Sequence, residues 1–592
     1  MTEISRVFDL LKLSLEKFNK EDIVATKKNG EWIKYSTRQF LKEVDAISRG
    51  LVAKGIKKDD KVAIMSPNRP EWNICDFGIM QIGATQVPMY PTLAENDIKF
   101  IAKDADIRII FVSDKTLYDK LNAVKTRDNA TFEIFTFDEI PGISCWNEVL
   151  KLGKENSSID LDTYRREIKP DDLLTLIYTS GTTGTPKGVM LTHDNLVTNV
   201  RESSKLYPAG FTKAISFLPL SHVFERMVFY MYLYLGISVY YAESMDTIAA
   251  DISDIKPHGF TTVPRLLEKV YDRIVERGSQ LTGVKRKLFF WALNLGLMYE
   301  LDGKNGPWYE FQLKIANKLV FKKWREALGG NIMAIVSGGA ALQPRLARVF
   351  WAAGMPVLEG YGLTETSPVI NVNGLRKGEA KFTTVGRTIK DVEVKIAEDG
   401  EILCKGPNVM KGYYNRPDLS AEVIDKDGFF HTGDIGEIVD GKYLRITDRK
   451  KEIFKTAGGK YIAPQMLENK FKESIFIEQV MVIGENERFP AVLVLPSFAT
   501  LQKWCEKKEI PYTTNVEMSK DERVVAKIWS EVEKFNQEFG SWERVKKIEL
   551  LSIEWSIDGG EFTPKLSLRR KAILEKYKLQ VEKLYRNANE QS

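Results

Sequence analysis

Tyr178-Thr179-Ser180-Gly181-Thr182-Thr183-Gly184-Thr185-Pro186-Lys187-Gly188-Val189 is the stretch around which the rest of the chain is organised. The apolar run from Leu173 to Ile177 precedes it and predicts a buried strand, so the glycines and hydroxyl groups fall on the loop that leaves this strand. Such a loop suits an anion, because glycines let backbone N–H groups come close, hydroxyl groups add neutral donors and a lysine adds positive charge. We therefore predict that phosphate is bound by Thr179, Ser180, Gly181, Thr182, Thr183, Gly184 and Lys187.

Two other interpretations of this stretch are less favourable. In the Walker phosphate loop the lysine directly follows the last glycine and is itself followed by Ser or Thr. Here Pro186 precedes Lys187 and Gly188 follows it, which excludes that motif. A flexible linker is also rich in Gly, Ser and Thr, but the apolar strand that runs directly into this loop makes a linker unfavourable.

The composition is that of a folded globular protein with more than one domain. At 592 residues the chain exceeds what one hydrophobic core usually serves, and its hydrophobic and charged fractions are 43% and 28%. The net charge of +5 is small for this length and the charges are interspersed, so we expect no nucleic-acid partner. The four cysteines lie far apart in the sequence, which indicates a reducing compartment and no zinc site.

The N-terminus and the most apolar segment favour a cytoplasmic location. Glu3 and the lack of a long apolar run behind it predict no secretory signal. Met227 to Ala242 is shorter than the ~20 residues of a spanning helix and contains Gly236. We expect this segment to form a buried helix followed by a core strand.

Strands and helices alternate before the phosphate loop. Helical spacing of apolar residues begins at Phe40, and the segments that follow predict a strand at 61–65, a helix at 72–82, a strand at 86–88, a helix at 95–102 and a strand at 107–112. This alternation predicts an α/β protein whose parallel sheet is covered on both faces. Residues 118–170 are more polar and predict an irregular connection to the phosphate loop.

A second chemical cluster occupies residues 359–368, Glu-Gly-Tyr-Gly-Leu-Thr-Glu-Thr-Ser-Pro. Tyr361 offers a flat ring on which a purine can stack, and a glycine on each side lets the base approach. Thr364 offers a donor to phosphate, and Glu365 is a hard oxygen ligand suited to Mg²⁺. Taken alone, the cluster is equally compatible with a turn after a strand that exposes one acid.

Together the two clusters resemble the signatures of the adenylate-forming superfamily, which includes acyl-CoA synthetases, luciferases and the adenylation domains of peptide synthetases. The resemblance implies a large N-terminal domain at 1–448, with parallel-rich sheets wrapped by helices and a small β-barrel subdomain at about 385–445. It also implies a mobile α+β C-terminal lid at 449–592. The β-barrel region does contain turn dipeptides between short strands, for example at 399–400 and 427–428.

The resemblance also implies further site residues. The apolar run from Phe217 predicts a strand with His222 at its end. The resemblance places His222 beside the acyl pocket, although a lone histidine there is equally compatible with a core residue. Asp434 and Arg449 would bind the ribose, and Lys451, in a charge run that could also be a solvated face, would be the hinge. The nucleotide would be contacted by Gly339, Ala340, Tyr361, Gly362 and Thr364, and Mg²⁺ by Glu365 and Thr179.

The chain is most similar to the long-chain fatty acid–CoA ligases, in residues 218–226, in a helical insert at 279–328 and in residues 360–368. This similarity implies ATP, Mg²⁺, a fatty acid and coenzyme A, with acyl-AMP as the intermediate. Alternatives are transfer to a carrier-protein thiol, or a binding protein without turnover. Peripheral contact with the inner face of the membrane and a homodimer are left open, and no amphipathic anchor stands out.

One position departs from the family pattern. Near the C-terminus the family carries Thr-Pro-Thr-Leu-Lys, whose lysine bridges the acyl carboxylate and the α-phosphate. Here the sequence from Thr563 is Thr-Pro-Lys-Leu-Ser, so Ser567 takes the position of that lysine. Lys565 lies two residues away, on the same side of an extended segment, and we expect it to do the bridging after a local shift. The residues expected to act in the reaction are therefore Lys565, Thr364, Glu365 and Lys451.

Overall fold

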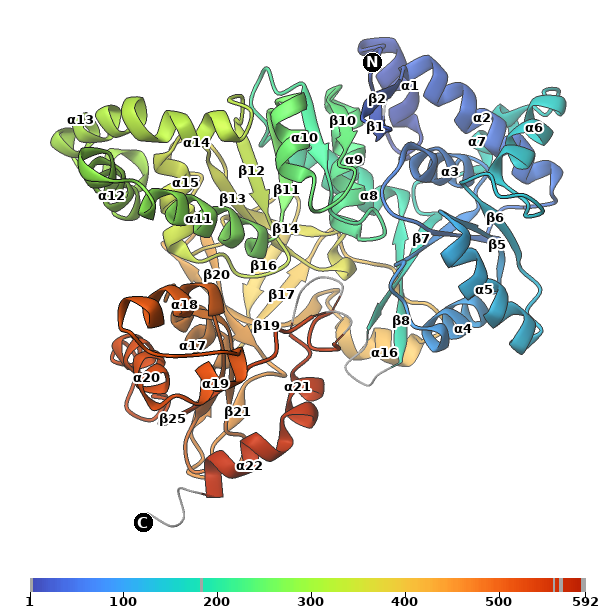
Figure 1. The fold of residues 1–592 in the computed structure, drawn as a ribbon. Helices are drawn as coiled ribbons and strands as arrows, with labels where there is room; N and C mark the ends of the chain where they lie inside the picture. Colours follow the sequence, from blue (N-terminus) through green and yellow to red (C-terminus); the bar gives the residue numbers. More distant parts are fainter. Residues whose placement is uncertain (1–3, 181–184, 557–558, 564–567, 587–592) are drawn as a thin grey trace.

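The structure is a computed structural model that describes residues 4–180, 185–556, 559–563 and 568–586. A large N-terminal domain contains two extended sheets covered by helices, with a curled four-stranded sheet beside them. A smaller C-terminal domain, orange to red in Figure 1, follows. The α/β class predicted from the alternation of strands and helices is confirmed.

The first sheet carries the predicted phosphate-loop strand. Its order is β18 (Gly412–Tyr413), β8 (Pro186–Thr192), β7 (Leu173–Ser180), β4 (Thr85–Met89), β3 (Lys61–Met65), β5 (Ile107–Val112) and β6 (Glu133–Thr136). The strands from β7 to β6 are parallel, whereas β8 and β18 are antiparallel to their neighbours. The helices of this half of the domain are α1 (Asp9–Lys17), α2 (Thr37–Ala53), α3 (Pro70–Met80), α4 (Glu95–Asp104), α5 (Lys115–Asp128), α6 (Trp146–Glu155) and α7 (Leu161–Glu167).

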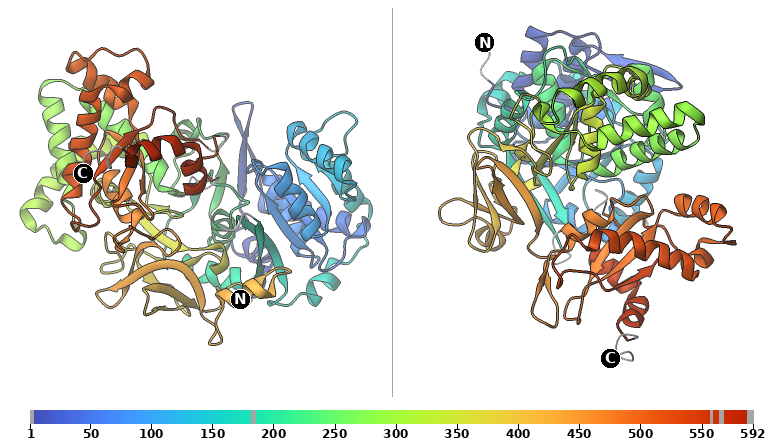
Figure 2. Two further views of the ribbon diagram at one scale, coloured as in Figure 1. Left: turned by 90° about the horizontal axis from the view of Figure 1, so that it is seen from below. Right: turned by 90° about the vertical axis from the view of Figure 1, so that its left-hand side faces the viewer.

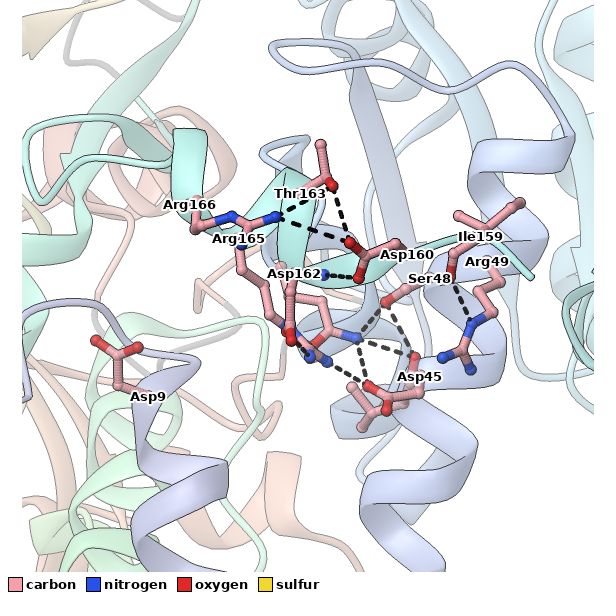
Figure 3. Close-up of polar contacts among 12 residues, drawn as sticks. Asp9, Asp45, Ser48, Arg49, Ile159, Asp160, Asp162, Thr163, Arg165 and Arg166 are labelled. Atoms are coloured by element: carbon pink, nitrogen blue, oxygen red, sulfur yellow. Dashed lines mark hydrogen bonds and ion pairs between the residues drawn. The ribbon is translucent and has the colours of Figure 1, made fainter. Parts of the chain in front are cut away.

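The expectation of an irregular connection at 118–170 is wrong. The segment contains most of α5 together with β6, α6 and α7. α5 begins where the side chain of Asp114 accepts hydrogen bonds from the backbone N–H groups of Thr116 and Leu117. α7 is fixed to α2 by Arg165, which donates to Asp45 at 2.5 Å and to Gln81 at 2.7 Å, as Figure 3 shows around Asp45. This contact holds the segment that leads directly into β7.

The second sheet is larger and is also mixed. Its order is β15 (Arg387–Thr388), β14 (Val369–Val372), β13 (Val357–Gly362), β12 (Ala334–Ser337), β11 (Gly259–Thr262), β9 (Lys213–Ser216), β10 (Ser238–Tyr241), β1 (Val24–Lys28) and β2 (Glu31–Tyr35). The strands from β13 to β1 are parallel. Its helices include α8 (His193–Ser204), α9 (Val223–Leu235), α10 (Ile248–Ile255), α11 (Pro264–Ser279) and α15 (Pro344–Ala352). The segment 227–242 forms most of α9 followed by β10, as expected.

A fully buried ion pair joins helices that belong to the two sheets. Arg226 of α9 donates to Asp76 of α3 at 2.5 Å, and the two side chains are 1% and 0% exposed. Tyr230 donates to the same carboxylate at 2.5 Å, and Arg226 also donates to the hydroxyl of Thr175 at 2.7 Å. Because Thr175 lies on β7, the pair ties the phosphate-loop strand to α9.

The predicted helical insert at 279–328 is largely helical in the structure. It consists of α12 (Gly283–Leu297), the 3₁₀ turn η1 (Leu301–Gly303), α13 (Pro307–Ala316), the π-helical turn η2 (Asn317–Phe321) and α14 (Lys322–Ala327). α12 packs against α15 and α13. Figures 1 and 2 show α12 and α13 at the outer edge of the large domain. No helix in the described part of the chain is both long enough and apolar enough to cross a membrane.

The curled sheet has the order β16 (Glu393–Ile396), β17 (Glu401–Lys405), β19 (Phe430–Val439) and β20 (Tyr443–Arg449), with helix α16 (Pro417–Val423) inserted. The C-terminal domain has its own apolar core between a three-stranded sheet and helices. Its elements are β21 (Phe454–Lys455), β22 (Tyr461–Ile462), α17 (Pro464–Phe471), β23 (Ile477–Ile483), β24 (Ala491–Pro496), α18 (Phe498–Lys507), α19 (Asn515–Lys520), α20 (Glu522–Asn536), β25 (Lys547–Leu550), α21 (Arg570–Lys576) and α22 (Lys578–Arg586).

Candidate active site

The strands on either side of the predicted phosphate loop form a β-hairpin. β7 and β8 pair antiparallel, with Thr179 opposite Lys187 and Tyr178 opposite Gly188. A Cβ atom on Gly188 would lie 3.1 Å from the ring of Tyr178, so the close pairing favours glycine there. Gly181, Thr182, Thr183 and Gly184 lie outside the described residues. The described hairpin residues place Thr179 and Lys187 on paired positions at the base of the loop.

Lys187 is connected to Glu365 through a tyrosine that the sequence analysis missed. The ammonium group of Lys187 lies 5.0 Å from the ring centroid of Tyr413, whose hydroxyl group donates to the carboxylate of Glu365 at 3.0 Å. Tyr413 reaches this position because β18 adds to the edge of β8, with Tyr413 opposite Val189. Burial raises the pKa of the Tyr413 hydroxyl, so it stays protonated and can donate.

Glu365 lies in η3 (Thr364–Thr366), a 3₁₀ turn that contacts β8. Its backbone carbonyl accepts from the N–H group of Met410, just before β18. Gly362 precedes this turn, and a Cβ atom there would lie 1.7 Å from the carbonyl oxygen of Pro368, so only glycine fits. The close approach of the Pro368 carbonyl therefore explains why residue 362 is a glycine, in addition to its predicted role near a base.

Tyr361, Asp434 and Arg449 come together from three separate strands. The hydroxyl group of Tyr361 on β13 donates to Asp434 on β19 at 2.7 Å, and Nε of Arg449 on β20 donates to the other carboxylate oxygen at 3.1 Å. Burial raises the pKa of Asp434, although the bonds from Arg449 and Tyr361 oppose this shift. The three residues predicted for adenine and ribose therefore form one hydrogen-bonded group.

His222 does not lie at the end of a strand, and that expectation is wrong. The strand β9 ends at Ser216, and His222 is the N-cap of α9, where its Nδ1 accepts from the N–H group of Phe224 at 3.1 Å. The ring of Phe224 lies beside Gly338, at 3.4 Å from where a Cβ atom would be. The start of α9 thus adjoins the segment that carries Gly339 and Ala340, both of which are exposed.

The predicted hinge follows β20 directly. Lys451 is exposed in the turn between β20 and β21. The buried carboxylate of Asp448 accepts from the backbone N–H groups of Arg449 at 2.6 Å and Gln465 at 3.2 Å, and Gln465 lies in the first turn of α17. Burial raises the pKa of Asp448 to about 7. Asp448 therefore fixes the end of β20 to the C-terminal domain, a role that the sequence analysis did not predict.

Further contacts between the two domains lie on the face formed by α11 and α15. Arg265 at the start of α11 forms an ion pair with Glu478 of β23. Arg345 of α15 donates to the backbone carbonyl of Lys472 at 3.4 Å. In this arrangement the C-terminal domain packs on the second sheet's helices rather than on α4 and α5 (Figure 1). Lys565 and Ser567 lie outside the described residues.

The residues predicted to hold Mg²⁺ have suitable chemistry. Glu365 provides a carboxylate and Thr179 a hydroxyl group, both hard oxygen ligands, and Mg²⁺ sites commonly combine one or two carboxylates with substrate phosphates. The hydrogen bond from Tyr413 occupies one oxygen of Glu365 and leaves the other for a cation. The donor set therefore fits Mg²⁺ held jointly with a triphosphate.

The two domains of the chain each match a known family. Residues 15–414 match the family described as AMP-binding enzyme, and residues 452–589 match the AMP-binding enzyme C-terminal domain. The chain therefore belongs to the AMP-binding, adenylate-forming family, whose members use ATP to activate acyl groups. The family predicted from the two motifs is confirmed.

Known relatives agree with this assignment. A long-chain-fatty-acid–CoA ligase of Mycobacterium bovis is 31% identical over 94% of this chain and 93% of its own length. The peroxisomal long chain acyl-CoA synthetase 6 of Arabidopsis thaliana is 32% identical over 91% of this chain and 80% of its own length. Among solved structures, the adenylation domain of a carboxylate reductase from Mycobacterium chelonae superimposes with a TM-score of 0.74 at 21% identity, covering 98% and 91% of the two chains. That structural likeness shows the fold alone.

Proposed function

We propose that this protein activates a long-chain fatty acid with ATP, releasing pyrophosphate, and then transfers the acyl group from acyl-AMP to coenzyme A. The observation that supports it best is the continuous segment from Tyr361 to Glu365. At one end Tyr361 bonds the ribose candidate Asp434, and at the other Glu365 meets Tyr413 and, through it, Lys187. This segment would align the sugar and the phosphates of one ATP molecule.

In the first step a carboxylate oxygen of the fatty acid attacks the α-phosphate, and the bond to the pyrophosphate oxygen breaks. The substrate is its own nucleophile, so no Ser, Cys or His nucleophile is required. The backbone N–H groups and hydroxyl groups of the hairpin, with Lys187, would stabilise the charge that develops on the phosphates. Glu365 and Thr179 would hold Mg²⁺, which neutralises phosphate charge when bound.

The ribose would be held by Asp434, whose two oxygens already accept two hydrogen bonds, and by Arg449. The ring of Tyr361 would support the adenine, with Thr364 as a donor to the α-phosphate. Gly339 and Ala340 would line the nucleotide site from the end of β12. His222, whose helix adjoins that segment, would lie beside the acyl group.

In the second step the thiol of coenzyme A attacks the acyl carbon and AMP leaves. We propose that the C-terminal domain changes position between the two steps by rotation at Lys451, with the domain boundary near 448 and 449. Because Asp448 precedes Lys451 and its partner Gln465 follows it, the hydrogen bond between them would break in this rotation. The exposed position of Lys451 in a turn supports this role.

Lys565 is proposed to replace the lysine that the family has at the position of Ser567. Lys565→Ala should lower the rate of pyrophosphate release by about two orders of magnitude, the loss typical when one charge-stabilising donor is removed. The matched control is Lys571→Ala, which removes a lysine from the nearby helix α21. An unchanged adenylation rate in Lys565→Ala would remove this assignment.

The proposed activity is tested by pyrophosphate release with ATP and Mg²⁺ across fatty acids of increasing length, with and without coenzyme A. We expect release with long acids and a thioester product only when coenzyme A is present. Adenylate without a thioester would instead favour a carrier-protein acceptor. No release with any acid would contradict the enzymatic proposal and leave a binding protein.

A further inference from the structure

The helical insert presents an apolar stripe on its outer face. Trp308, Phe311, Ile315 and Leu319 are 71%, 54%, 36% and 46% exposed. Their spacing of three and four residues places them on one face of α13 and η2. The rings of Trp308 and Phe311 stack at 5.6 Å between centroids with an angle of 24°. A surface helix normally turns its polar face outward, so a continuous exposed apolar stripe indicates a binding surface.

The inner face of the same helix is already packed, so the stripe is not a displaced core face. The inward residues Tyr309, Leu313, Ala316 and Val320 belong to the buried core. Tyr309 donates to the backbone carbonyl of Leu295 on α12 at 2.6 Å, and Asn317 donates to that of Ala352 on α15 at 3.0 Å. The stripe is therefore held outward on a well-anchored helix.

Basic residues run alongside the stripe. Lys314 and Lys318 each precede a stripe residue by one position, and Lys322 and Lys323 follow Leu319. All four lysines are exposed, and from Phe311 to Arg325 the sequence contains no Asp or Glu. Among the described residues, only one of these four lysines forms an ion pair, Lys322 with Glu326 at 3.7 Å. The start of α12 adds the exposed, apolar Val284 beside three exposed basic residues, Lys285, Arg286 and Lys287.

We propose that the outer face of α13 and η2 docks on the surface of an anionic bilayer. Apolar and aromatic residues would enter the boundary between headgroups and acyl chains, while the lysines would lie against negative headgroups. Charge complementarity selects this partner, since uncompensated lysines beside an apolar stripe suit an anionic lipid surface better than a second copy with the same positive charges.

Docking here does not depend on the proposed acyl substrate. If that substrate is a long-chain acid, the surface would bring the enzyme to the bilayer in which such an acid dissolves. The two proposals fail separately, because vesicle binding is measured without ATP or fatty acid, and pyrophosphate release is measured without vesicles.

The test is flotation of the purified full chain with vesicles of phosphatidylcholine alone or mixed with phosphatidylglycerol. We expect binding to the anionic vesicles, weakened by added salt. Trp308→Ala with Phe311→Ala should weaken this binding by about tenfold or more, and Lys314→Gln with Lys318→Gln should remove the preference for phosphatidylglycerol. The matched control is Trp542→Ala, which removes an exposed tryptophan of the C-terminal domain whose ring centroid lies 5.8 Å from the ammonium group of Lys460.

Circular dichroism and pyrophosphate release without vesicles should be unchanged in all of these variants, which shows that they fold. Two results would overturn the proposal. One is equal flotation of the parent and the Trp308→Ala, Phe311→Ala variant with anionic vesicles. The other is that sedimentation velocity shows the parent as a dimer and this variant as a monomer, while neither protein binds vesicles. That result would make the face a contact between two copies of the chain.

Discussion

Lys187 and Tyr413 form a cation–π pair, with 5.0 Å between the ammonium nitrogen and the ring centroid. The tyrosine belongs to β18, far along the chain from the hairpin that carries the lysine. Its hydroxyl group also bonds Glu365, so one aromatic side chain orients both the phosphate-loop cation and the candidate metal ligand. A bound triphosphate would draw Lys187 from the ring toward the phosphates, while the bond to Glu365 could persist.

Tyr413→Phe should therefore separate the two contacts. The ring beneath Lys187 remains, but Glu365 loses a hydrogen bond of a kind worth about 1–2 kcal/mol. We expect the Mg²⁺ concentration that gives the half-maximal rate of pyrophosphate release to rise roughly tenfold. Tyr414→Phe, one residue away, is the control. An unchanged Mg²⁺ requirement in Tyr413→Phe would show that Glu365 is positioned by other means.

Asp434→Asn should weaken nucleotide binding. An amide offers only one accepting oxygen, so either Tyr361 or Arg449 loses its partner, and the ribose loses a charged acceptor. We expect AMP affinity measured by calorimetry to fall by about ten- to a hundredfold, equivalent to ~1.5–3 kcal/mol. Asp440→Asn changes an exposed acid in a turn of the same curled sheet and should leave affinity unchanged. Equal AMP affinity in Asp434→Asn and the parent would exclude a ribose role.

Arg226→Met should strongly destabilise the large domain. It leaves Asp76 buried without its cation and removes the donor to Thr175, a change that typically costs ~3–5 kcal/mol. Denaturant unfolding of the N-terminal domain measures this loss. Arg348→Met, which breaks a partly exposed pair with Glu300, should cost ~1 kcal/mol or less. Adding Asp76→Leu to Arg226→Met should recover most of the loss, and failure to do so would point to packing rather than charge.

Glu225 gives the large domain a pH-dependent stability. Its side chain is buried, accepts from Ser216 at 2.5 Å and from Thr261, and burial raises its pKa from 4.5 to about 7. Because the folded state holds the proton more tightly, its contribution to stability is fully present below pH ~4.5 and declines until pH ~7. We expect the parent to lose ~1–3 kcal/mol of unfolding free energy over this window relative to Glu225→Gln. Parallel pH profiles of the two proteins would contradict the shifted pKa.

Much of the fold could be predicted from periodicity. The strands at 61–65 and 107–112 have the predicted bounds because each is a short apolar run between helices with clear spacing. The region at 118–170 was missed although Leu117, Leu121 and Val124 are buried at helical spacing on α5. Its many charged residues concealed this pattern. The apolar run after residue 216 suggested a strand up to His222, but β9 ends at Ser216 and α9 begins at Val223. Pro219, within this run, cannot donate a ladder hydrogen bond and disfavours a strand there.

The candidate site could be predicted only as separate motifs. Tyr361, Glu365 and Asp434 each belong to a motif with recognisable chemistry. The structure places Tyr361 in contact with Asp434 of another motif, and Glu365 in contact with Tyr413, which belongs to none of the predicted motifs. Tyr413 could not be predicted, because its role arises from strand pairing between residues distant in sequence. Asp448 was likewise hidden, since its partner Gln465 is brought close only by the start of α17.

The pairing of β18 with β8 has a consequence for biosynthesis. Residues 189 and 190 obtain their outer neighbours only when 412 and 413 have left the ribosome. Until then the outer edge of β8 stays unpaired, Glu365 lacks its tyrosine, and contacts of such long sequence separation form slowly. A nascent chain that ends before this point would therefore expose an open strand edge to chaperones.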